Sequence, residues 1–148
     1  MGEPSIHASC VAIGGRGVLI RGASGAGKST LALRLILDAP RVLAPAELVA
    51  DDRVLLRVEA GALVARPVPA LAGLVEARGL GLRRLPYRDR VSLAVVVDLG
   101  APDATRLPPE QAQTVRISGC ALPRIAPEHL ESAALLVAVA LASEPYAN

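Results

Sequence analysis

The feature that most constrains this chain is a glycine-rich octapeptide at residues 22–29, GASGAGKS, which matches the pattern G-x-x-x-x-G-K-[ST]. An apolar segment expected to be a strand, residues 17–21, precedes it. A Leu- and Ala-rich segment expected to be a buried helix, residues 28–38, follows it. Glycines let backbone N–H groups wrap closely around a phosphate, and the start of a helix adds its dipole. The octapeptide therefore predicts a phosphate-binding loop (P-loop, or Walker A) for a nucleoside triphosphate.

Two side chains at the end of the octapeptide have distinct chemical tasks. Lys28 is the only lysine among 16 basic residues, and its compact charge suits the outer phosphates. The hydroxyl of Ser29 suits Mg²⁺, a cation that prefers oxygen ligands. All eight residues are therefore expected to bind the nucleotide: Gly22, Ala23, Ser24, Gly25, Ala26, Gly27, Lys28 and Ser29.

Composition limits the other function classes. A chain of 148 residues, 52% hydrophobic and 20% charged, fits one globular domain over residues 1–148 and excludes a disordered segment. A net charge of +2 with only two aromatic residues argues against nucleic-acid binding. The longest apolar run, residues 133–142, is too short to span a membrane, and the first residues do not read as a signal peptide. We expect a soluble, cytoplasmic domain with no nucleic-acid or membrane partner, and with Cys10 and Cys120 as buried thiols.

The remaining pattern predicts an α/β fold. Strands are expected at residues 6–13 and 17–21 around a Gly14-Gly15 turn, at 48–50, as a hairpin at 54–58 and 62–66, and at 92–97 and 114–118. Residues 79–81 are expected to form a mobile loop, and residues 101–109 a proline-rich loop. A final helix is expected over residues 127–142, and Pro40 is expected to lie beyond the end of the first helix.

A phosphoryl-transfer site also needs a carboxylate, and two strand ends supply candidates. Asp98 ends an apolar segment typical of a Walker B strand, whereas residues 48–52 end in the pair Asp51-Asp52. Adjacent carboxylates repel each other, which makes one of them a better proton acceptor. In extended backbone the two side chains would point to opposite faces, so only one would face a substrate. Spacing alone does not choose between Asp98 and the pair.

Some P-loop classes can be excluded. A GTPase needs an N-K-x-D segment to read guanine, and the only asparagine is Asn148. The signature of an ABC-type ATPase is also missing from the sequence. Kinase chemistry remains, and the arginines Arg83, Arg84 and Arg106 lie in expected loops from which they could clamp a phosphoryl group.

Several spaced segments, in the right order, resemble the HPr kinase/phosphorylase family in its C-terminal catalytic domain. They are the approach to the P-loop from His7 to Gly22, ADDRV at 50–54, LVEARGLGL at 74–82, Arg106-Leu107, and ALPRI at 121–125. The resemblance runs from His7 to about Pro123 and is to a short form without the family's N-terminal domain. It implies a single P-loop kinase domain with a mixed β-sheet around a central P-loop helix, similar to phosphoenolpyruvate carboxykinase.

The resemblance also implies a reaction. Family members use ATP with Mg²⁺, or in some cases pyrophosphate, to phosphorylate a serine of HPr or an HPr-like phosphocarrier of a regulatory phosphotransferase system. Many members also remove that phosphate by phosphorolysis, and members tend to be hexamers. By this resemblance Asp52 is the general base, and the general acid of the reverse reaction. The other catalytic positions are His7, Lys28 and Arg106, and the Mg²⁺ ligands are Ser29 and Glu76.

The sequence departs from the family pattern in the region between Arg83 and Arg90, which is shorter than the family's glycine-rich loop, and at two further places. Thr30 stands where a glutamate typically follows the P-loop serine. The segment after ALPRI reads PEHLES, without the glycine-arginine-asparagine step that the family links to dephosphorylation, and His129 in it is expected at the surface. These departures bear on phosphorylase activity more than on kinase activity. Two other functions stay open: a P-loop kinase for a small molecule, and a nucleotide-sensing module that transfers no phosphoryl group.

Overall fold

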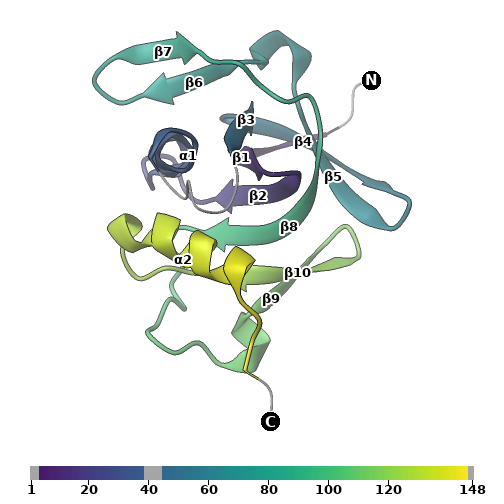
Figure 1. Ribbon diagram of the computed structural model, residues 1–148, viewed down its shortest axis with the longest axis vertical. Helices are drawn as coiled ribbons and strands as arrows, with labels where there is room; N and C mark the ends of the chain where they lie inside the picture. Colours follow the sequence, from purple (N-terminus) through teal and green to yellow (C-terminus); the bar gives the residue numbers. More distant parts are fainter. Residues whose placement is uncertain (1–3, 39–44, 147–148) are drawn as a thin grey trace.

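The computed structural model describes residues 4–38 and 45–146, and it has an α/β fold built on a mixed β-sheet (Figure 1). The helices are α1 (Lys28–Leu37) and α2 (Leu130–Ala142), and short 3₁₀ turns occur at Pro69–Leu71 and Glu110–Ala112. The strands are β1 (Ser5–Ile13), β2 (Arg16–Arg21), β3 (Ala46–Ala50), β4 (Arg53–Glu59), β5 (Ala62–Pro67), β6 (Leu74–Ala77), β7 (Gly81–Arg84), β8 (Val91–Asp98), β9 (Thr114–Ile117) and β10 (Cys120–Ile125).

Five strands pair into a closed ring. β1 pairs with β2, β2 with β8, β8 with β5, β5 with β4, and β4 with β1. The β2–β8 pairing is parallel and the others are antiparallel, so the sheet is mixed. The C-terminal half of β1, from Cys10 to Ile13, pairs with β3. The C-terminal part of β8, at Val96 and Val97, pairs with β10, and β10 pairs in turn with the edge strand β9. Closure leaves most strands of the ring without an unpaired edge.

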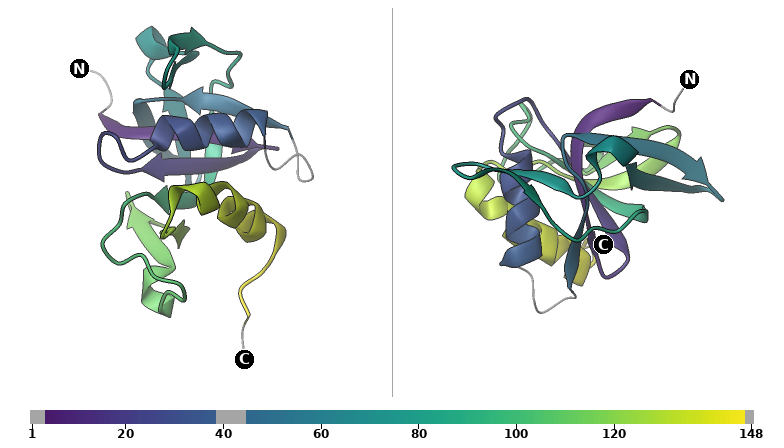
Figure 2. Two further views of the ribbon diagram at one scale, coloured as in Figure 1. Left: turned by 90° about the vertical axis from the view of Figure 1, so that its left-hand side faces the viewer. Right: turned by 90° about the horizontal axis from the view of Figure 1, so that it is seen from above.

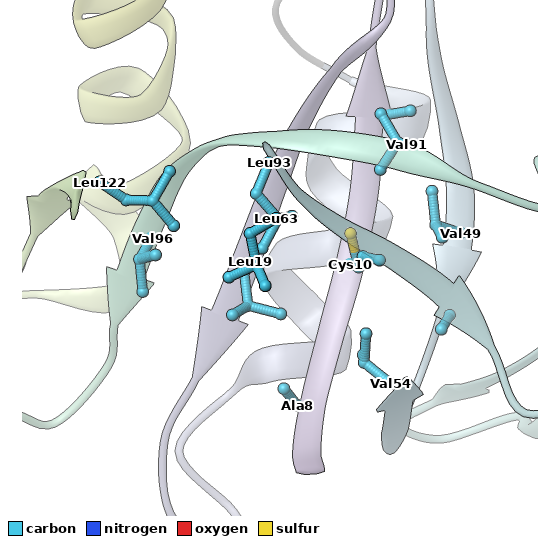
Figure 3. Close-up of a cluster of buried hydrophobic side chains, with 13 residues drawn as sticks. Ala8, Cys10, Leu19, Val49, Val54, Leu63, Val91, Leu93, Val96 and Leu122 are labelled. Atoms are coloured by element: carbon cyan, nitrogen blue, oxygen red, sulfur yellow. The ribbon is translucent and has the colours of Figure 1, made fainter. Parts of the chain in front are cut away.

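Alternation along the strands separates two apolar clusters. Ala8, Cys10 and Leu19 point inside the ring, where they pack with Val54 and Val96. Figure 3 shows this inner cluster between the strands, with the Cys10 sulfur among the carbons. The side chains between them in sequence point outward and form a second cluster beneath the helices. Because successive residues of a strand face opposite sides, a single strand such as β1 supplies both clusters.

Both helices cover the outer face of the ring. Leu31 and Leu35 of α1, and Ala133 and Val137 of α2, pack on Val11 and the outward residues of β2 and β8. The two-stranded β6–β7 sheet lies on the far side of α1, and the β9–β10 hairpin lies at the opposite end of the molecule (Figures 1 and 2). Helix α1 is therefore enclosed by the main sheet, by β6 and by α2.

Most expected elements occur within two residues of their expected ends. The turn at Gly14 and Gly15 has positive φ at both residues, 57° and 87°, as a tight hairpin turn requires. The final helix begins at Leu130 rather than at residue 127, because His129 is extended with a φ of −133°. His129 is exposed, as expected. Pro40 lies outside the described residues.

Three local expectations hold only in part. Residues 79 and 80 lie in the turn of the β6–β7 hairpin, but Gly81 already belongs to β7, where it pairs with Ala77. Helix α1 is buried or half-buried along most of its length, but Arg34 and Leu37 are exposed. Cys10 is buried, and burial raises the pKa of its thiol, but Cys120 is only half-buried because β10 lies near the sheet edge. No helix in the described part of the chain is long and apolar enough to cross a membrane.

Candidate active site

A cavity of about 320 Å³ lies between the P-loop, the start of α1 and the β6–β7 hairpin. Four parts of the chain build its walls: the P-loop with the first turn of α1, the start of β1, the bend between β3 and β4, and β6 with β7. Its lining includes His7, Ser9, Ser24, Gly25, Gly27, Lys28, Ser29, Thr30, Asp51, Asp52, Glu76, Arg78 and Leu82. The cavity is thus polar around the P-loop, and the hairpin side adds the charged Glu76 and Arg78 beside the apolar Leu74, Val75 and Leu82.

The first turn of α1 opens into this cavity. Gly27 is the N-terminal cap with a φ of 104°, and no side chain caps the helix among the described residues. The first N–H groups of a helix have no partner within the helix, so they remain available to an anion. The Lys28 ammonium donates to the carbonyls of Gly22 and Ala23, at 2.8 and 3.0 Å. Its positive charge is therefore held at the rim of the loop, and the side chain is largely buried.

The Asp51 carboxylate is the most heavily hydrogen-bonded group of the cavity. Ser9 Oγ donates to its Oδ1 at 2.5 Å, and the backbone N–H of Glu76 donates to its Oδ2 at 3.1 Å. Ser29 Oγ donates a shared hydrogen bond, 2.8 Å from Oδ1 and 2.7 Å from Oδ2. Asp51 is buried, and these donors satisfy a carboxylate that would otherwise be costly to bury. It thus fixes the P-loop serine.

The neighbouring Asp52 has a different environment. Its Oδ1 lies 3.1 Å from Nε2 of His7, and the two side chains are 68% and 41% exposed. Asp52 has a φ of 68°, and the N–H of Arg53 donates to the carbonyl of Asp51 at 2.8 Å, which closes a three-residue γ-turn. The expectation that the two aspartates point to opposite faces was wrong, because this turn is not extended. Both side chains line the cavity.

Strand β1 supplies two polar side chains to the cavity lining. His7 and Ser9 both line the cavity, and the next residues on the same face, Val11 and Ile13, lie in the outer apolar cluster. Our sequence reasoning missed Ser9, and it used Asp51 only as the neighbour of Asp52, with no role of its own. The signal for Ser9 was present, because a serine two residues after His7 in a strand must share its face.

The alternative carboxylate, Asp98, lies elsewhere. It does not line the cavity, and both of its oxygens accept hydrogen bonds from arginines: Arg21 at 2.7 and 2.9 Å, and Arg124 at 2.6 Å. Burial acts to raise the pKa of this carboxyl, but the hydrogen bonds and charges of Arg21 and Arg124 outweigh burial and lower it. Asp98 therefore joins β2, β8 and β10, and its charge is already neutralised.

Of the remaining expected site residues, some line the cavity and others do not. Glu76 lines the cavity from β6. Ala26 is not in the lining, and its N–H donates to the Ala23 carbonyl at 3.0 Å within the loop. Arg106 is exposed in the segment between β8 and β9 and is not among the lining residues. The structure thus groups His7, Lys28, Ser29, Asp52 and Glu76 but not Arg106.

The oxygen ligands fit Mg²⁺ better than a softer metal. Ser29 and Asp51 present a hydroxyl and a carboxylate in contact, and Glu76 adds a second carboxylate to the same lining. In the described residues no three His, Cys, Asp or Glu side chains gather into a metal site. Mg²⁺ rarely needs such a site, because it keeps waters and takes phosphate oxygens beside one or two carboxylates.

Comparison with known proteins points to one family. The family model for the HPr serine kinase C-terminal domain matches residues 2–86, which include the P-loop, Asp51, Asp52 and Glu76 but not Arg106. The HPr kinase/phosphorylase of Shouchella clausii is 46% identical over 79 residues, covering 53% of this chain and 24% of that protein. The HPr kinase/phosphorylase of Mycoplasma mycoides is 40% identical over 76 residues, 51% of this chain and 22% of that protein.

A solved structure extends the similarity beyond the matched half of the chain. The Hpr(Ser) kinase/phosphatase of Coxiella burnetii superimposes with a TM-score of 0.72 and 28% identity, covering 91% of each chain. The fold therefore has a solved counterpart over nearly its full length. By contrast, the aligned stretch spans only about a quarter of each curated relative quoted above.

Proposed function

This chain belongs to the HPr serine kinase C-terminal domain family, and we propose that it transfers a phosphoryl group from ATP to a serine of an HPr-like phosphocarrier. The observation that carries the proposal is the meeting of two groups in one cavity. One is a P-loop whose helix end is uncapped, and the other is an exposed aspartate, Asp52, paired with His7. The first binds phosphates, and the second can receive a proton from an incoming hydroxyl.

The proposed transfer assigns the proton to Asp52. The seryl oxygen of the carrier attacks the γ-phosphorus of ATP, the bond from that phosphorus to the β,γ-bridging oxygen breaks, and ADP leaves. Asp52 takes the seryl proton, and His7 at 3.1 Å orients the carboxylate. The 68% exposure of Asp52 supports this role, because a protein substrate has to bring its serine to the base from solvent.

The P-loop side of the cavity supplies positive charge. Lys28 and the first N–H groups of α1 would hold the phosphates, so that charge on the transferring group is stabilised as it develops. Bound Mg²⁺ would neutralise phosphate charge, and Ser29 and Glu76 are the residues we propose to hold it, with Asp51 fixing Ser29. The role of Arg106 rests on the family resemblance alone, since Arg106 does not line the cavity.

Further properties follow from the family and are part of the proposal. They are a phosphoenolpyruvate carboxykinase-like arrangement around the P-loop helix, one catalytic domain over residues 1–148, a cytoplasmic location and a homohexamer. Assembly is supported by Leu135 and Val139, which are exposed one turn apart on α2. Light scattering of the purified protein measures the assembly state directly.

The transfer is tested with labelled ATP, Mg²⁺ and the HPr-like carrier of the host. We expect phosphoserine on the carrier with the wild-type protein and its loss with Asp52→Asn. The matched control is Asp89→Asn, which removes an exposed carboxylate outside the cavity lining and should transfer at the wild-type rate. Equal transfer by Asp52→Asn and Asp89→Asn would overturn the assignment of the base.

Other outcomes of the same assay identify the alternatives. Label on a metabolite but not on the carrier indicates a small-molecule kinase, and ATP binding without any transfer indicates a nucleotide-sensing module. Replacing ATP by pyrophosphate tests the second donor. Adding phosphate to phosphorylated carrier tests phosphorolysis, which the PEHLES segment at residues 127–132 makes the less supported direction.

A further inference from the structure

Ser9 is a fully buried polar side chain that the proposed reaction does not use. It lies in β1, has no exposed surface, and lines the cavity between His7 and the P-loop. Its hydroxyl donates to Oδ1 of Asp51 at 2.5 Å, the length of a strong hydrogen bond to an ionised carboxylate. A buried hydroxyl with such a bond holds its acceptor in place, because a hydrogen bond is electrostatically stronger in a buried, low-dielectric site than in water.

The backbone around Ser9 leaves the hydroxyl little freedom. On one side β1 pairs with β2, where Ser9 lies opposite Ile20. On the other side the N–H of Ala8 donates to the carbonyl of Asp52 at 3.2 Å, which ties β1 to the bend that carries both aspartates. The strand ladder therefore fixes the position of Ser9 relative to Asp51, and the hydroxyl only has to rotate toward the carboxylate.

Asp51 links Ser9 to the P-loop, because its carboxylate binds both Ser9 and Ser29. Its carboxylate is held by Ser9 at Oδ1 and by the N–H of Glu76 at Oδ2, and it accepts the Ser29 proton with both oxygens. A hydroxyl has one proton and two lone pairs. Because Ser29 donates its hydrogen to the Asp51 carboxylate, its lone pairs remain free to bind a cation. If the carboxylate turns, Ser29 loses that orientation.

We propose that Ser9 is a positioning residue for divalent-cation binding, acting through Asp51 on Ser29. The inference rests on the proposed function only in that the bound ligand is a magnesium nucleotide. It adds Ser9 of β1 to a cation-binding group of residues otherwise drawn from the P-loop, the β3–β4 bend and β6. Groups that orient a metal ligand from the second layer change metal affinity by about 10- to 100-fold when they are removed.

The test compares nucleotide binding, without any phosphoryl transfer, over a titration of Mg²⁺. Fluorescent ADP is bound to the wild type and to Ser9→Ala, Ser9→Cys and Ser9→Thr, with the exposed Ser92→Ala as the control. Ser9→Cys keeps the shape but has a weak donor, and Ser9→Thr keeps the hydroxyl. Thermal unfolding of each variant shows which ones are folded. If Ser9→Ala does not fold, the comparison of Ser9→Cys with the wild type decides the test.

We expect Ser9→Ala and Ser9→Cys to need at least about tenfold more Mg²⁺ for half-maximal binding, with binding in EDTA unchanged. Ser9→Thr and Ser92→Ala should match the wild type. Two results overturn the proposal: a wild-type Mg²⁺ titration for Ser9→Ala, or an equal loss of binding with and without Mg²⁺, which would indicate a structural role only. A wild-type protein that binds the nucleotide but does not phosphorylate the carrier refutes the proposed function and leaves this comparison valid.

Discussion

Two adjacent aspartates acquire different tasks from the conformation of one residue. A φ of 68° at Asp52 turns its side chain into the same cavity as Asp51. The Asp51 carboxylate is buried and accepts hydrogen bonds from Ser9, Ser29 and the N–H of Glu76. The Asp52 side chain is exposed and lies beside His7. A held carboxylate suits the orientation of Ser29, and an accessible one suits proton transfer. A positive φ in a non-glycine residue stores strain, and such strain is common at functional sites.

The two aspartates should therefore separate binding from chemistry. We expect Asp51→Asn to lose at least about tenfold in Mg²⁺-dependent nucleotide affinity, because its amide cannot accept from all three donors. Asp52→Asn should keep nucleotide affinity and lose about 10²- to 10⁴-fold in transfer rate. Isothermal titration calorimetry with MgADP and the transfer assay measure the two effects, and the same pattern in both variants would contradict the division.

Asp98 gives a prediction about stability instead. Asp98→Asn should lower the free energy of unfolding by about 2 kcal/mol near neutral pH, because it breaks hydrogen bonds to Arg21 and Arg124. The folded-state pKa of Asp98 is lowered, so its stabilisation is present above the unfolded-state pKa and is lost as the pH falls through the folded-state value. In urea unfolding the difference between wild type and Asp98→Asn should shrink below about pH 4. A difference that is constant down to about pH 2 would contradict this account.

At the scale of elements, the sequence predicts what local chemistry decides. The octapeptide, the Gly14-Gly15 turn and the apolar runs of β1 and β2 each depend on neighbouring residues, and the structure has these elements. The β6–β7 hairpin was missed, because β7 is exposed along its length and has no alternating pattern. The partners of Ser9 and Asp98 also could not be predicted, since those contacts join residues 42 and 26 or more apart in the chain.

The start of α1 is shaped by its contact with α2. A Cβ at Gly27 would lie 2.6 Å from Cδ2 of Leu130, and Gly27 has a φ of 104°. Gly27→Ala should lower the melting temperature and weaken MgADP binding, because both the clash and the backbone strain fall on the helix end that faces the cavity.

The companion variant Leu130→Ala separates the two causes. In the double variant Gly27→Ala/Leu130→Ala the clash is gone, so the cost of Gly27→Ala should fall to the backbone strain alone, about 1 kcal/mol. Thermal and urea unfolding of the four proteins of the cycle measure this. Identical costs of Gly27→Ala in both backgrounds would show that Leu130 does not constrain the loop.

At the scale of the whole molecule, closure of the ring brings the site together. His7 comes from β1, Asp51 and Asp52 from the β3–β4 bend, and the P-loop follows β2, so the pairings of β1 with β2, β3 and β4 set their distances. These pairings join distant parts of the chain, and the parallel β2–β8 pair joins segments more than 70 residues apart. Sequence patterns predicted the strands of the ring but not this order.

Gly17 tests how tightly the ring closes. A Cβ there would lie 2.8 Å from Val91, 2.9 Å from Leu93 and 2.9 Å from the backbone oxygen of Ser92. Because that oxygen cannot move without shifting β8, Gly17→Ala should cost about 2 kcal/mol in urea unfolding. Ser92→Ala, an exposed change at the same crossing, should stay within about 0.5 kcal/mol of the wild type. A Gly17→Ala protein as stable as the wild type would show that the β2–β8 contact is loose.

In the proposed reaction the γ-phosphoryl group of ATP, bound at the P-loop, passes to a protein serine whose proton goes to Asp52. A single-turnover reaction of γ-labelled ATP with excess enzyme and carrier tests it most directly, with the label followed by mass spectrometry. We expect label on one carrier serine, none on a carrier with that serine replaced by alanine, and none with Asp52→Asn while Asp52→Asn still binds MgATP. Label released as free phosphate at the same rate with and without the carrier would contradict it.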